Sequence, residues 1–422
     1  MRLLLIGSGG REHALAWKLA ASPFCEALFC APGNAGTARE GTNVPELDVA
    51  DHAAVARFCE RERIAMVVVG PEVPLVAGLA DDLRAALPEL KVVGPGRAGA
   101  QLEGSKAFSK AFMAEYGIPT AAYESFGADE LDAARAFLRT LTPPYVLKAD
   151  GLAAGKGVVI APDLASAEAE LADMLSGKFG AASATVVVEE FLAGREFSVF
   201  VVTDGRDYQL LPVAQDYKRV GVGDTGPNTG GMGAVSPARA ADKHMMAKVR
   251  ERVVEPTLAG LRDRGIPYTG ILFLGLIDVG GDPFVIEYNC RLGDPETQVV
   301  LPRITSDLLG LFASLFDGTV AEAEPRIDSR AGATVVVASG GYPGAYESGK
   351  AISGLDELGE GIRVFLAGVA EDGDDALVTS GGRVLAVTSF GLTTPEAAHA
   401  SRRAARRIRF EGAFLREDVG AE

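Results

Sequence analysis

The sequence has few cysteines and histidines, and they are scattered along the chain. The four cysteines, Cys25, Cys30, Cys59 and Cys290, form no CxxC pair, and the four histidines do not cluster with them. A zinc site needs such a cluster, so zinc binding is not expected. A disulfide between Cys25 and Cys30 is conceivable, but free thiols in a reducing compartment are the simpler interpretation, and we expect a cytoplasmic protein.

Long hydrophobic runs are absent as well. A membrane-spanning helix needs about 20 consecutive apolar residues, and no stretch of the sequence approaches that length. The first residues, MRLLLIGSGG, contain an apolar run shorter than the roughly 7–15 residues of a signal peptide core. We therefore expect neither a membrane partner nor secretion.

Positive charge is in the minority. Lysine and arginine total 41 against 57 aspartates and glutamates, which gives a formal net charge of −16. Nucleic acids and anionic membranes bind cationic surfaces, so neither is expected as a partner, whereas a small phosphorylated substrate held by a few local cations is compatible with this charge. The hydrophobic content of 48% excludes a disordered chain, and 422 residues predict two to four domains.

The first hundred residues alternate short apolar runs with amphipathic stretches of helix length. The apolar runs are Leu3–Gly7, Ala27–Pro32, Ala65–Glu72 and Lys91–Pro95. The stretches between them include Glu12–Ala21, Asp51–Arg63 and Leu75–Ala86. This order is typical of βαβ units, so we expect a parallel sheet, with ligands at the carboxyl ends of its strands.

From Glu103 onward the pattern changes to mixed α and β elements. The expected strands are Tyr145–Ala149, Val158–Ile160, Thr185–Phe191, Phe197–Thr203, Gly270–Asp278 and Phe284–Asn289, with helices at Gly104–Tyr116 and Ser306–Phe316. Short strands follow at Ala333–Ala338, Arg363–Ala370 and Arg383–Ser389, with a last helix at Thr394–Arg407. We predict an α/β and α+β chain of three domains, residues 1–103, 104–325 and 326–422.

The segment GSGGREH, Gly7–His13, lies at an expected strand-to-helix turn. Backbone N–H groups and the helix dipole favour an anion at such a turn. It is not a dinucleotide fingerprint, because G-x-G-x-x-G requires glycine at position 12, where a glutamate stands. A phosphate or phosphosugar site and a tight turn that merely needs small residues are both compatible with it.

A second glycine-rich segment, KADGLAAGKGV, begins with Lys148 at the end of an expected strand. It matches a Walker A loop only in part, because Gly157 stands where that loop has Ser or Thr. A glycine flap over a triphosphate, with the charge of Lys148 on the phosphates, fits these residues.

The segment VVVEEFLAG, Val186–Gly194, is a strand running into a turn. Such a turn can offer backbone groups to an adenine, and the carboxylate of Glu196 just beyond it can accept from ribose hydroxyls. On this segment alone, an amphipathic edge strand with surface glutamates is the simpler interpretation.

The segment VIEYNCRLGDPE, Val285–Glu296, carries the strongest chemistry. Strand alternation places Glu287, Asn289 and Arg291 on one face and Ile286, Tyr288 and Cys290 on the other. A carboxylate beside an amide oxygen suits a hard Mg²⁺ ion, and a neighbouring guanidinium suits phosphoryl oxygens.

In this order, the segments resemble the ATP-grasp superfamily and, within it, the glycinamide ribonucleotide synthetase family. Matching segments span nearly the whole chain: GSGGREHALAWKLAAS, APGNAGT, VGPE, QLEGSKAF, KADGLAAGKGV, QDYKRVGVGDTGPNTGGMGA, IEYNCRLGDPETQ, GGYPG and SGGRVLAVT. The resemblance implies an N-terminal pre-ATP-grasp domain, an ATP-grasp fold with a lid subdomain at about 119–193, and a small mixed β domain. It also implies ligation of glycine to 5-phosphoribosylamine through glycyl phosphate, using ATP and Mg²⁺ or Mn²⁺, in de novo purine biosynthesis.

The resemblance further implies roles for individual residues. Those for ATP are Lys106, Lys148, Gly155, Lys156, Glu189, Phe191, Leu192 and Glu196. Glu287 and Asn289 would bind the metal, and Arg291, Lys148 and Asp294 would be catalytic. Phosphoribosylamine would lie on Gly9, Gly10 and Arg11, with Asn34, Gly36 and Glu72 near its sugar. The glycine and phosphoryl region would be lined by Asp216, Lys218, Asn228, Gly231 and Arg291.

One position departs from the wider superfamily. Many relatives carry a further metal carboxylate about twelve residues before the strand glutamate, where this chain has Gly275, and the nearest acid is Asp278. One metal ion completed by water is therefore expected. Another ATP-grasp ligase or a carboxylase is the alternative function, and a nicotinamide-binding protein is an alternative of a different class. We expect a monomer, with room for transient contacts with neighbouring purine-pathway enzymes.

Overall fold

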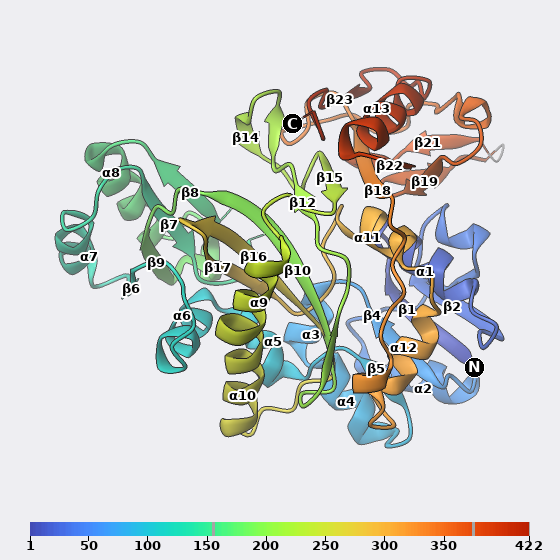
Figure 1. The fold of residues 1–422 in the computed structure, drawn as a ribbon, viewed down its shortest axis with the longest axis horizontal. Helices are drawn as coiled ribbons and strands as arrows, with labels where there is room; N and C mark the ends of the chain where they lie inside the picture. Colours follow the sequence, from blue (N-terminus) through green and yellow to red (C-terminus); the bar gives the residue numbers. More distant parts are fainter. Residues whose placement is uncertain (154–156, 374–375, 422) are drawn as a thin grey trace.

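The computed structural model describes residues 1–153, 157–373 and 376–421. Its elements surround four larger sheets, called here the N-terminal, central, peripheral and C-terminal sheets. The N-terminal and C-terminal sheets lie on one side of the molecule and the peripheral sheet on the other (Figure 1). No helix in the described part of the chain is both long and apolar enough to cross a membrane.

The N-terminal sheet is parallel, which confirms the prediction, and its strand order is β3-β2-β1-β4-β5. Its strands are β1 (Arg2–Gly7), β2 (Ala27–Pro32), β3 (Thr42–Asn43), β4 (Met66–Val69) and β5 (Lys91–Val93). Its helices are α1 (Gly10–Ala20), α2 (His52–Arg61), α3 (Glu72–Ala77) and α4 (Leu79–Ala86). The single helix expected over Leu75–Ala86 is wrong, because Gly78 at φ +92° ends α3 and a new helix begins after it.

The central sheet is antiparallel, with strand order β11-β10-β16-β17. Its strands are β10 (Arg195–Thr203), β11 (Tyr208–Leu210), β16 (Gly270–Val279) and β17 (Asp282–Asn289). The helices beside it are α5 (Arg97–Gly104), α6 (Lys106–Glu115), α9 (Lys243–Val249) and α10 (Glu255–Asp263), the last two joined by a π-helical turn. Alternate residues of β10 belong to different hydrophobic cores: Val199 and Val201 lie in the core that includes residues of α9 and α10, whereas Phe200 and Val202 lie in the core that includes residues of α1.

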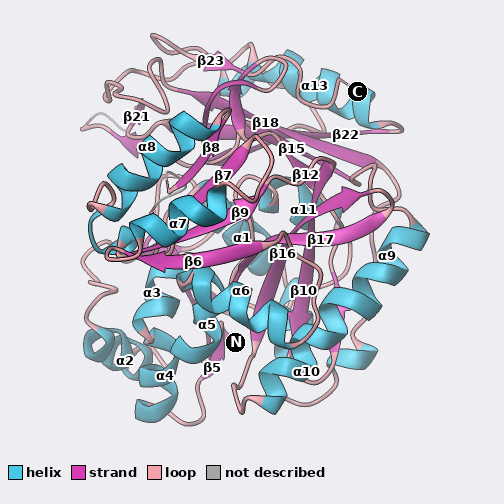
Figure 2. Ribbon diagram, turned by 90° about the vertical axis from the view of Figure 1, so that its left-hand side faces the viewer, coloured by secondary structure: helices cyan, strands magenta, loops and turns pink. Residues whose placement is uncertain are grey.

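The peripheral sheet, with order β6-β9-β7-β8, covers the segment for which the resemblance implied a lid. It consists of β6 (Tyr123–Gly127), β7 (Tyr145–Ala149), β8 (Val158–Ala161) and β9 (Thr185–Glu190), with α7 (Leu131–Leu138) and α8 (Leu164–Leu175) in front of it in Figure 2. Its side chains form a separate small core that includes Leu147, Leu171 and Val188. A sheet with its own core can move as a unit. Gly155 and Lys156 lie outside the described residues.

The C-terminal sheet takes two strands from the central part of the chain. Its order is β12-β15-β18-β22-β19, with β23 also paired to β18. The strands are β12 (Gln215–Asp216), β15 (Gly233–Ser236), β18 (Ala331–Ala338), β19 (Arg363–Leu366), β22 (Arg383–Gly391) and β23 (Phe414–Leu415). Smaller elements nearby are β13 (Arg219–Gly221), β14 (Thr225–Asn228), β20 (Val369–Glu371), β21 (Leu377–Thr379), α11 (Thr297–Arg303), α12 (Leu308–Ser314) and α13 (Thr394–Ala405). The strand expected over Arg363–Ala370 is thus two strands.

His13 of α1 joins the N-terminal and C-terminal sheets. Its Nδ1 accepts a hydrogen bond from the backbone N–H of Leu366 at 2.8 Å, and its ring meets Phe365 edge-on. Glu40 lies 3.9 Å from Nε2. Burial, and then the charge of Arg39, lower the pKa of His13 to about 4. The contact therefore requires a neutral imidazole.

We expect the protein to lose stability as the pH falls from 6.5 towards 4. In this window the unfolded chain binds a proton at His13 and the folded chain does not, so acid favours unfolding by up to about 3 kcal/mol. Urea unfolding at a series of pH values measures the effect. In His13→Asn, whose amide oxygen can accept from Leu366, the stability should vary less with pH. Identical pH profiles for the two proteins would contradict this assignment.

Candidate active site

The polar edge of β17 forms the centre of the site. The register of β17 on β16 shifts, so that Gly275 faces Glu287 and Leu276 faces Val285. Ile286 therefore lies in a bulge, where the regular alternation expected from the sequence is interrupted; it is only partly buried, and its carbonyl accepts from Lys148 at 3.2 Å. Gly275 leaves room here, since a β-carbon would stand 3.1 Å from Cγ of Glu287.

Two buried lysines lie on either side of Glu189. Lys148 of β7 is 3.0 Å from Oε1 of Glu189, and Lys110 of α6 is 2.9 Å from Oε2. Burial, only partly offset by Glu189, lowers the pKa of Lys110 to about 8. The resemblance placed Glu189 in the adenine hinge, but its side chain points into this ion-pair network. The adjacent Phe191 is 41% exposed, and Leu192 beside it is partly buried.

Lys106 begins α6 and reaches the glycine segment of the peripheral sheet. Its Nζ donates to the carbonyl of Gly151 at 3.3 Å. Burial lowers its pKa, while the nearby charge of Glu287 opposes that shift. Asp150 accepts from the backbone N–H of Ala107 at 2.7 Å and so ties the same segment to the helix. The two predicted phosphate lysines, Lys106 and Lys148, thus lie on the same side as Glu287.

A third group of charges consists of Glu196 on β10, Asp216 on β12, Lys218 two residues after it, and Glu296 in the loop after β17. Glu196 and Lys218 form an ion pair of 2.6 Å, with both side chains partly exposed. Burial raises the pKa of Asp216, with Lys218 opposing, and burial followed by the Asp216 charge raises the pKa of Glu296 to about 7. Although burial disfavours its charge, the surrounding carboxylates, led by Asp216, raise the pKa of Lys218. This group can hold an ammonium or a proton between its carboxylates.

Arg291 follows β17 and joins the N-terminal sheet to the central one. Its guanidinium meets Glu72 at the start of α3 at 3.3 Å and Glu103 of α5 at 2.7 Å, and it donates to the carbonyl of Leu292 at 3.1 Å. Burial works against its charge, but Glu103 and Glu72 raise its pKa. Arginine has five N–H groups, so two of them have no partner among the described residues.

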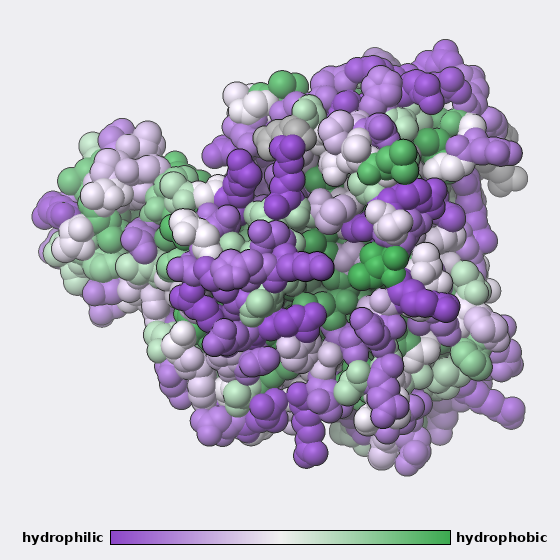
Figure 3. Space-filling view, in the orientation of Figure 1, coloured by the Kyte–Doolittle hydropathy of each residue, from purple (hydrophilic) through white to green (hydrophobic). Residues whose placement is uncertain are grey.

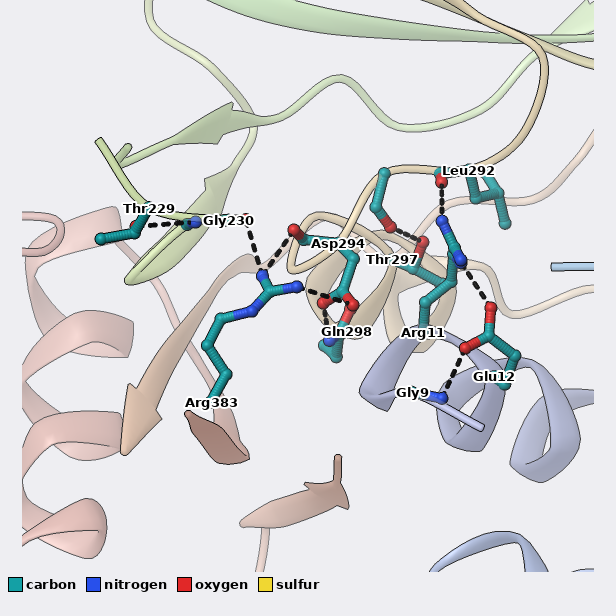
Figure 4. A network of polar contacts seen from close by, with 12 residues as sticks. Gly9, Arg11, Glu12, Thr229, Gly230, Leu292, Asp294, Thr297, Gln298 and Arg383 are labelled. Atoms are coloured by element: carbon teal, nitrogen blue, oxygen red, sulfur yellow. Dashed lines mark hydrogen bonds and ion pairs between the residues drawn. The ribbon is translucent and has the colours of Figure 1, made fainter. Parts of the chain in front are cut away.

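Asp294 lies where three parts of the chain meet (Figure 4). Its carboxylate is 3.0 Å from Arg383 of β22 and accepts from Gln298 at 2.7 Å. Burial would raise its pKa, but Arg383 and Arg11 outweigh burial and lower it. Arg383 also donates to the carbonyl of Gly230 at 2.6 Å. The C-terminal sheet therefore fixes both a predicted catalytic residue and the glycine-rich loop.

The glycine-rich loop approaches Asp294 closely because it has no side chain at Gly231. That residue has φ +112°, and a β-carbon there would stand 2.4 Å from Cδ of Pro295. Asn228, predicted to line the glycine region, is exposed on the β13–β14 hairpin, where it pairs with Arg219 beside Lys218. The hairpin is thus continuous with the Asp216–Lys218 group.

The start of α1 differs from the expected open anion site. The backbone N–H of Gly9 donates to Oε2 of Glu12 at 2.7 Å, and Arg11 is buried, 2.5 Å from Oε1 of the same carboxylate (Figure 4). Glu12 therefore already satisfies the N–H group that was expected to hold a phosphate. Gly10 lies against Gln298, whose amide nitrogen would be 2.7 Å from a β-carbon there.

Asn34 and Gly36, expected near the sugar, make structural contacts. The amide of Asn34 donates to the carbonyls of Ser8 at 2.7 Å and Leu366 at 3.0 Å, and its oxygen accepts from the N–H of Gly36. A β-carbon at Gly36 would stand 2.1 Å from Nδ1 of His13. Both residues hold the N-terminal turn against the C-terminal sheet.

Several residues of the site were missed in the sequence. They are Glu12, Glu103, Lys110, Glu296, Gln298 and Arg383. Glu12 and Glu296 stand inside segments described above, and Arg383 stands inside SGGRVLAVT. Arg383 meets partners that are distant in the chain, Gly230 and Asp294, whereas Glu12 contacts its neighbours Gly9 and Arg11. Gln298 gives one further indication: it is 2% exposed, and its Oε1 has no hydrogen-bond partner among the described residues. A buried acceptor without a donor fits a substrate hydroxyl or amine there.

The residues present fit one divalent metal bound jointly with nucleotide. Within the described ranges there is no group of three or more His, Cys, Asp or Glu that could hold a metal ion alone. Glu287 and Asn289 offer a carboxylate and an amide oxygen, and Mg²⁺ typically takes one or two such ligands together with substrate phosphates. Asp278 does not join them, since it accepts from the backbone N–H of Gly281 at the β16–β17 turn.

Comparisons with known families agree over the whole chain. Three models match: the N domain of phosphoribosylglycinamide synthetase at residues 1–103, its ATP-grasp (A) domain at 104–297 and its C domain at 332–422. Proteins named phosphoribosylamine–glycine ligase are similar throughout. That of Mesorhizobium japonicum is 50% identical and that of Salmonella typhimurium 49%, each over 100% of this chain and 98% of the relative.

Solved structures give the same result. The crystal structure of phosphoribosylamine–glycine ligase from Thermotoga maritima is 37% identical, with a TM-score of 0.84 over 99% of this chain and 100% of that one. Biotin carboxylase from Campylobacter jejuni shares the fold, with a TM-score of 0.68 at 15% identity over 99% of this chain and 94% of that one.

Proposed function

The chain belongs to the phosphoribosylglycinamide synthetase family, and on that basis we propose which of its residues act in each step of the reaction. It ligates glycine to 5-phosphoribosylamine with ATP, giving glycinamide ribonucleotide, ADP and phosphate in purine biosynthesis. This assignment of roles rests on one observation: five polar residues come together at one edge of the central sheet. They are Glu287, Asn289, Arg291, Lys106 and Lys148.

ATP lies between the peripheral and central sheets. The triphosphate is held by Lys106 and Lys148, with Gly155 and Lys156 assigned to the flap above it by the resemblance alone. The adenine lies against Phe191 and Leu192, and Glu196 accepts from the ribose. The separate core of the peripheral sheet supports its movement as a lid that excludes water from a hydrolysable intermediate.

Activation of glycine takes place at the end of β17. A divalent metal, which we take to be Mg²⁺, would be held by Glu287 and Asn289 and would neutralise phosphate charge when bound. The two spare N–H groups of Arg291 stabilise the charge on the phosphoryl oxygens as the glycine carboxylate attacks the γ-phosphorus, which gives glycyl phosphate and ADP. Asp216 and Lys218, beside Asn228 and Gly231, hold the glycine.

The amine of phosphoribosylamine attacks glycyl phosphate from the side of the N-terminal sheet. Asp294, kept ionised by Arg383 and Arg11, and the unpartnered oxygen of Gln298 accept from the amine or the sugar hydroxyls. Gly9, Gly10, Arg11, Asn34, Gly36 and Glu72 form the surrounding wall, with Arg11 the residue assigned to the phosphate. The attack forms the amide bond and releases phosphate.

One chain supplies every residue of this scheme, so we propose that a monomer suffices. All four cysteines are free thiols, which supports a reducing, cytoplasmic location.

We expect ADP release only when glycine, phosphoribosylamine and a divalent metal are present together. A coupled assay for ADP with freshly generated phosphoribosylamine measures this, with each component left out in turn. Bicarbonate should not replace glycine. Turnover with bicarbonate equal to that with glycine would favour the carboxylase alternative and overturn the proposal.

A further inference from the structure

We propose that Glu103 is a positioning residue that turns the oxygen of the Asn289 amide towards the metal. The inference rests on the metal-binding role proposed above for Glu287 and Asn289. Glu103 lies in the last turn of α5, next to the end of β17, and is 8% exposed. Glu103 stands in the segment QLEGSKAF, but the sequence assigns no role to it.

Four donors surround the Glu103 carboxylate. Oε1 accepts from Nδ2 of Asn289 at 3.1 Å and from Nη2 of Arg291 at 2.7 Å. Oε2 accepts from the backbone N–H of Cys290 at 2.8 Å and from its thiol at 3.2 Å. A carboxylate paired with arginine only accepts hydrogen bonds, so every group facing it must donate. Asn289 therefore presents its NH₂ group to Glu103.

The orientation of this amide decides whether Asn289 can bind a metal. Its oxygen lies on the side opposite its NH₂ group, and hard cations bind amide oxygens, not NH₂ groups. Among the described residues no hydrogen bond reaches Oδ1 of Asn289, so Glu103 alone fixes the amide. The same carboxylate holds Arg291, so Glu103 fixes the positions of both the Asn289 amide and the Arg291 guanidinium.

Replacing Glu103 by glutamine tests this with little change in shape. The introduced amide has one oxygen for the four donors. The backbone N–H of Cys290 cannot turn away, so we expect the oxygen to stay with it and the new NH₂ group to face both Asn289 and Arg291; the guanidinium, which can only donate, loses this partner. Asn289 must then flip to accept, which turns its own NH₂ group towards the metal. We expect metal affinity to fall about 10- to 100-fold, as for other residues that orient a metal ligand.

The effect should disappear or reverse when position 289 carries aspartate. An aspartate has no NH₂ group to misplace, and it repels the Glu103 carboxylate but accepts from the introduced glutamine. Glu103→Gln should therefore weaken metal binding in the wild-type background and leave it unchanged or strengthen it in an Asn289→Asp background. A residue that merely supports the fold would weaken both.

The measurement is Mn²⁺ binding with saturating ADP, followed by the EPR signal of free Mn²⁺, for wild type, Glu103→Gln, Asn289→Asp and the double variant. Unfolding midpoints without metal check that each protein is folded. Equal losses on Glu103→Gln in both backgrounds, or wild-type affinity in Glu103→Gln, would overturn the proposal. If the Glu103→Gln single variant does not fold, comparing Asn289→Asp with the double variant still tests the proposal. Weaker metal binding in the double variant than in Asn289→Asp would contradict it. Neither glycine nor phosphoribosylamine is present, so a failed ligase assay would leave this result intact.

Discussion

Replacing Glu287 by glutamine is expected to lower the rate of ADP release by about 100-fold or more while the protein stays folded. The substitution keeps size and removes one charge. Glu287 faces Gly275 across the bulged pair of β16 and β17, and its charge acts on Asp216 and Lys218. The carboxylate is the only charged ligand proposed for the metal, so its loss removes most of the attraction for the ion.

Steady-state rates over a range of Mg²⁺ concentrations measure this prediction, and the loss should be only partly recovered at high Mg²⁺. Asp278→Asn is the matched control: it removes the same charge from the neighbouring strand, but Asp278 caps the turn at Gly281. We expect nearly wild-type turnover there. Wild-type activity and Mg²⁺ dependence in Glu287→Gln would mean that β17 does not carry the metal ligand.

The local elements of this fold could be predicted from the sequence, whereas their pairing across sheets could not. Apolar runs such as Leu3–Gly7 became parallel strands because their burial is a local property of the pattern. β15 enters the C-terminal sheet by pairing with β18, about 100 residues away, and β12 enters it through β15, about 20 residues away. The bulge at Ile286 likewise depends on its partner strand, since alternation alone places this residue opposite Glu287.

The candidate site shows the same division. Residues whose type and spacing indicate metal binding, such as Glu287 beside Asn289, could be selected from the sequence. Residues that act through partners could not, because Glu103 meets Arg291 across 188 positions and Arg383 meets Gly230 across 153. In the sequence, Glu12 excludes a dinucleotide fingerprint and indicates nothing more. In the structure, its carboxylate accepts from the backbone N–H of Gly9 and pairs with Arg11.

Replacing Arg11 by alanine is expected to weaken phosphoribosylamine binding about 10- to 100-fold and to leave ATP binding nearly unchanged. The charge of Arg11 helps to lower the pKa of Asp294, and its guanidinium uses only two N–H groups within the described chain, on Glu12 and on the carbonyl of Leu292. Three N–H groups are left for a phosphate in a protein of net charge −16.

The burial of Arg11 adds a second expected effect. Removing one partner of a buried ion pair costs about 3–5 kcal/mol, because the other charge is left uncompensated, and Glu12 is 2% exposed. Arg11→Ala should therefore also lower the unfolding midpoint. The double variant Arg11→Ala with Glu12→Gln removes that stranded charge, so it should regain stability without regaining affinity for phosphoribosylamine.

Steady-state titration of each substrate separates these effects, with Arg39→Ala as the control. Arg39 is exposed in the same part of the chain. Arg39→Ala removes the same charge as Arg11→Ala, so it tests the long-range attraction of the phosphate alone. Its substitution should move neither constant. If the Michaelis constant for ATP rises as far as that for phosphoribosylamine in Arg11→Ala, or if the double variant recovers phosphoribosylamine affinity together with stability, the phosphate lies elsewhere and Arg11 serves only to neutralise Glu12.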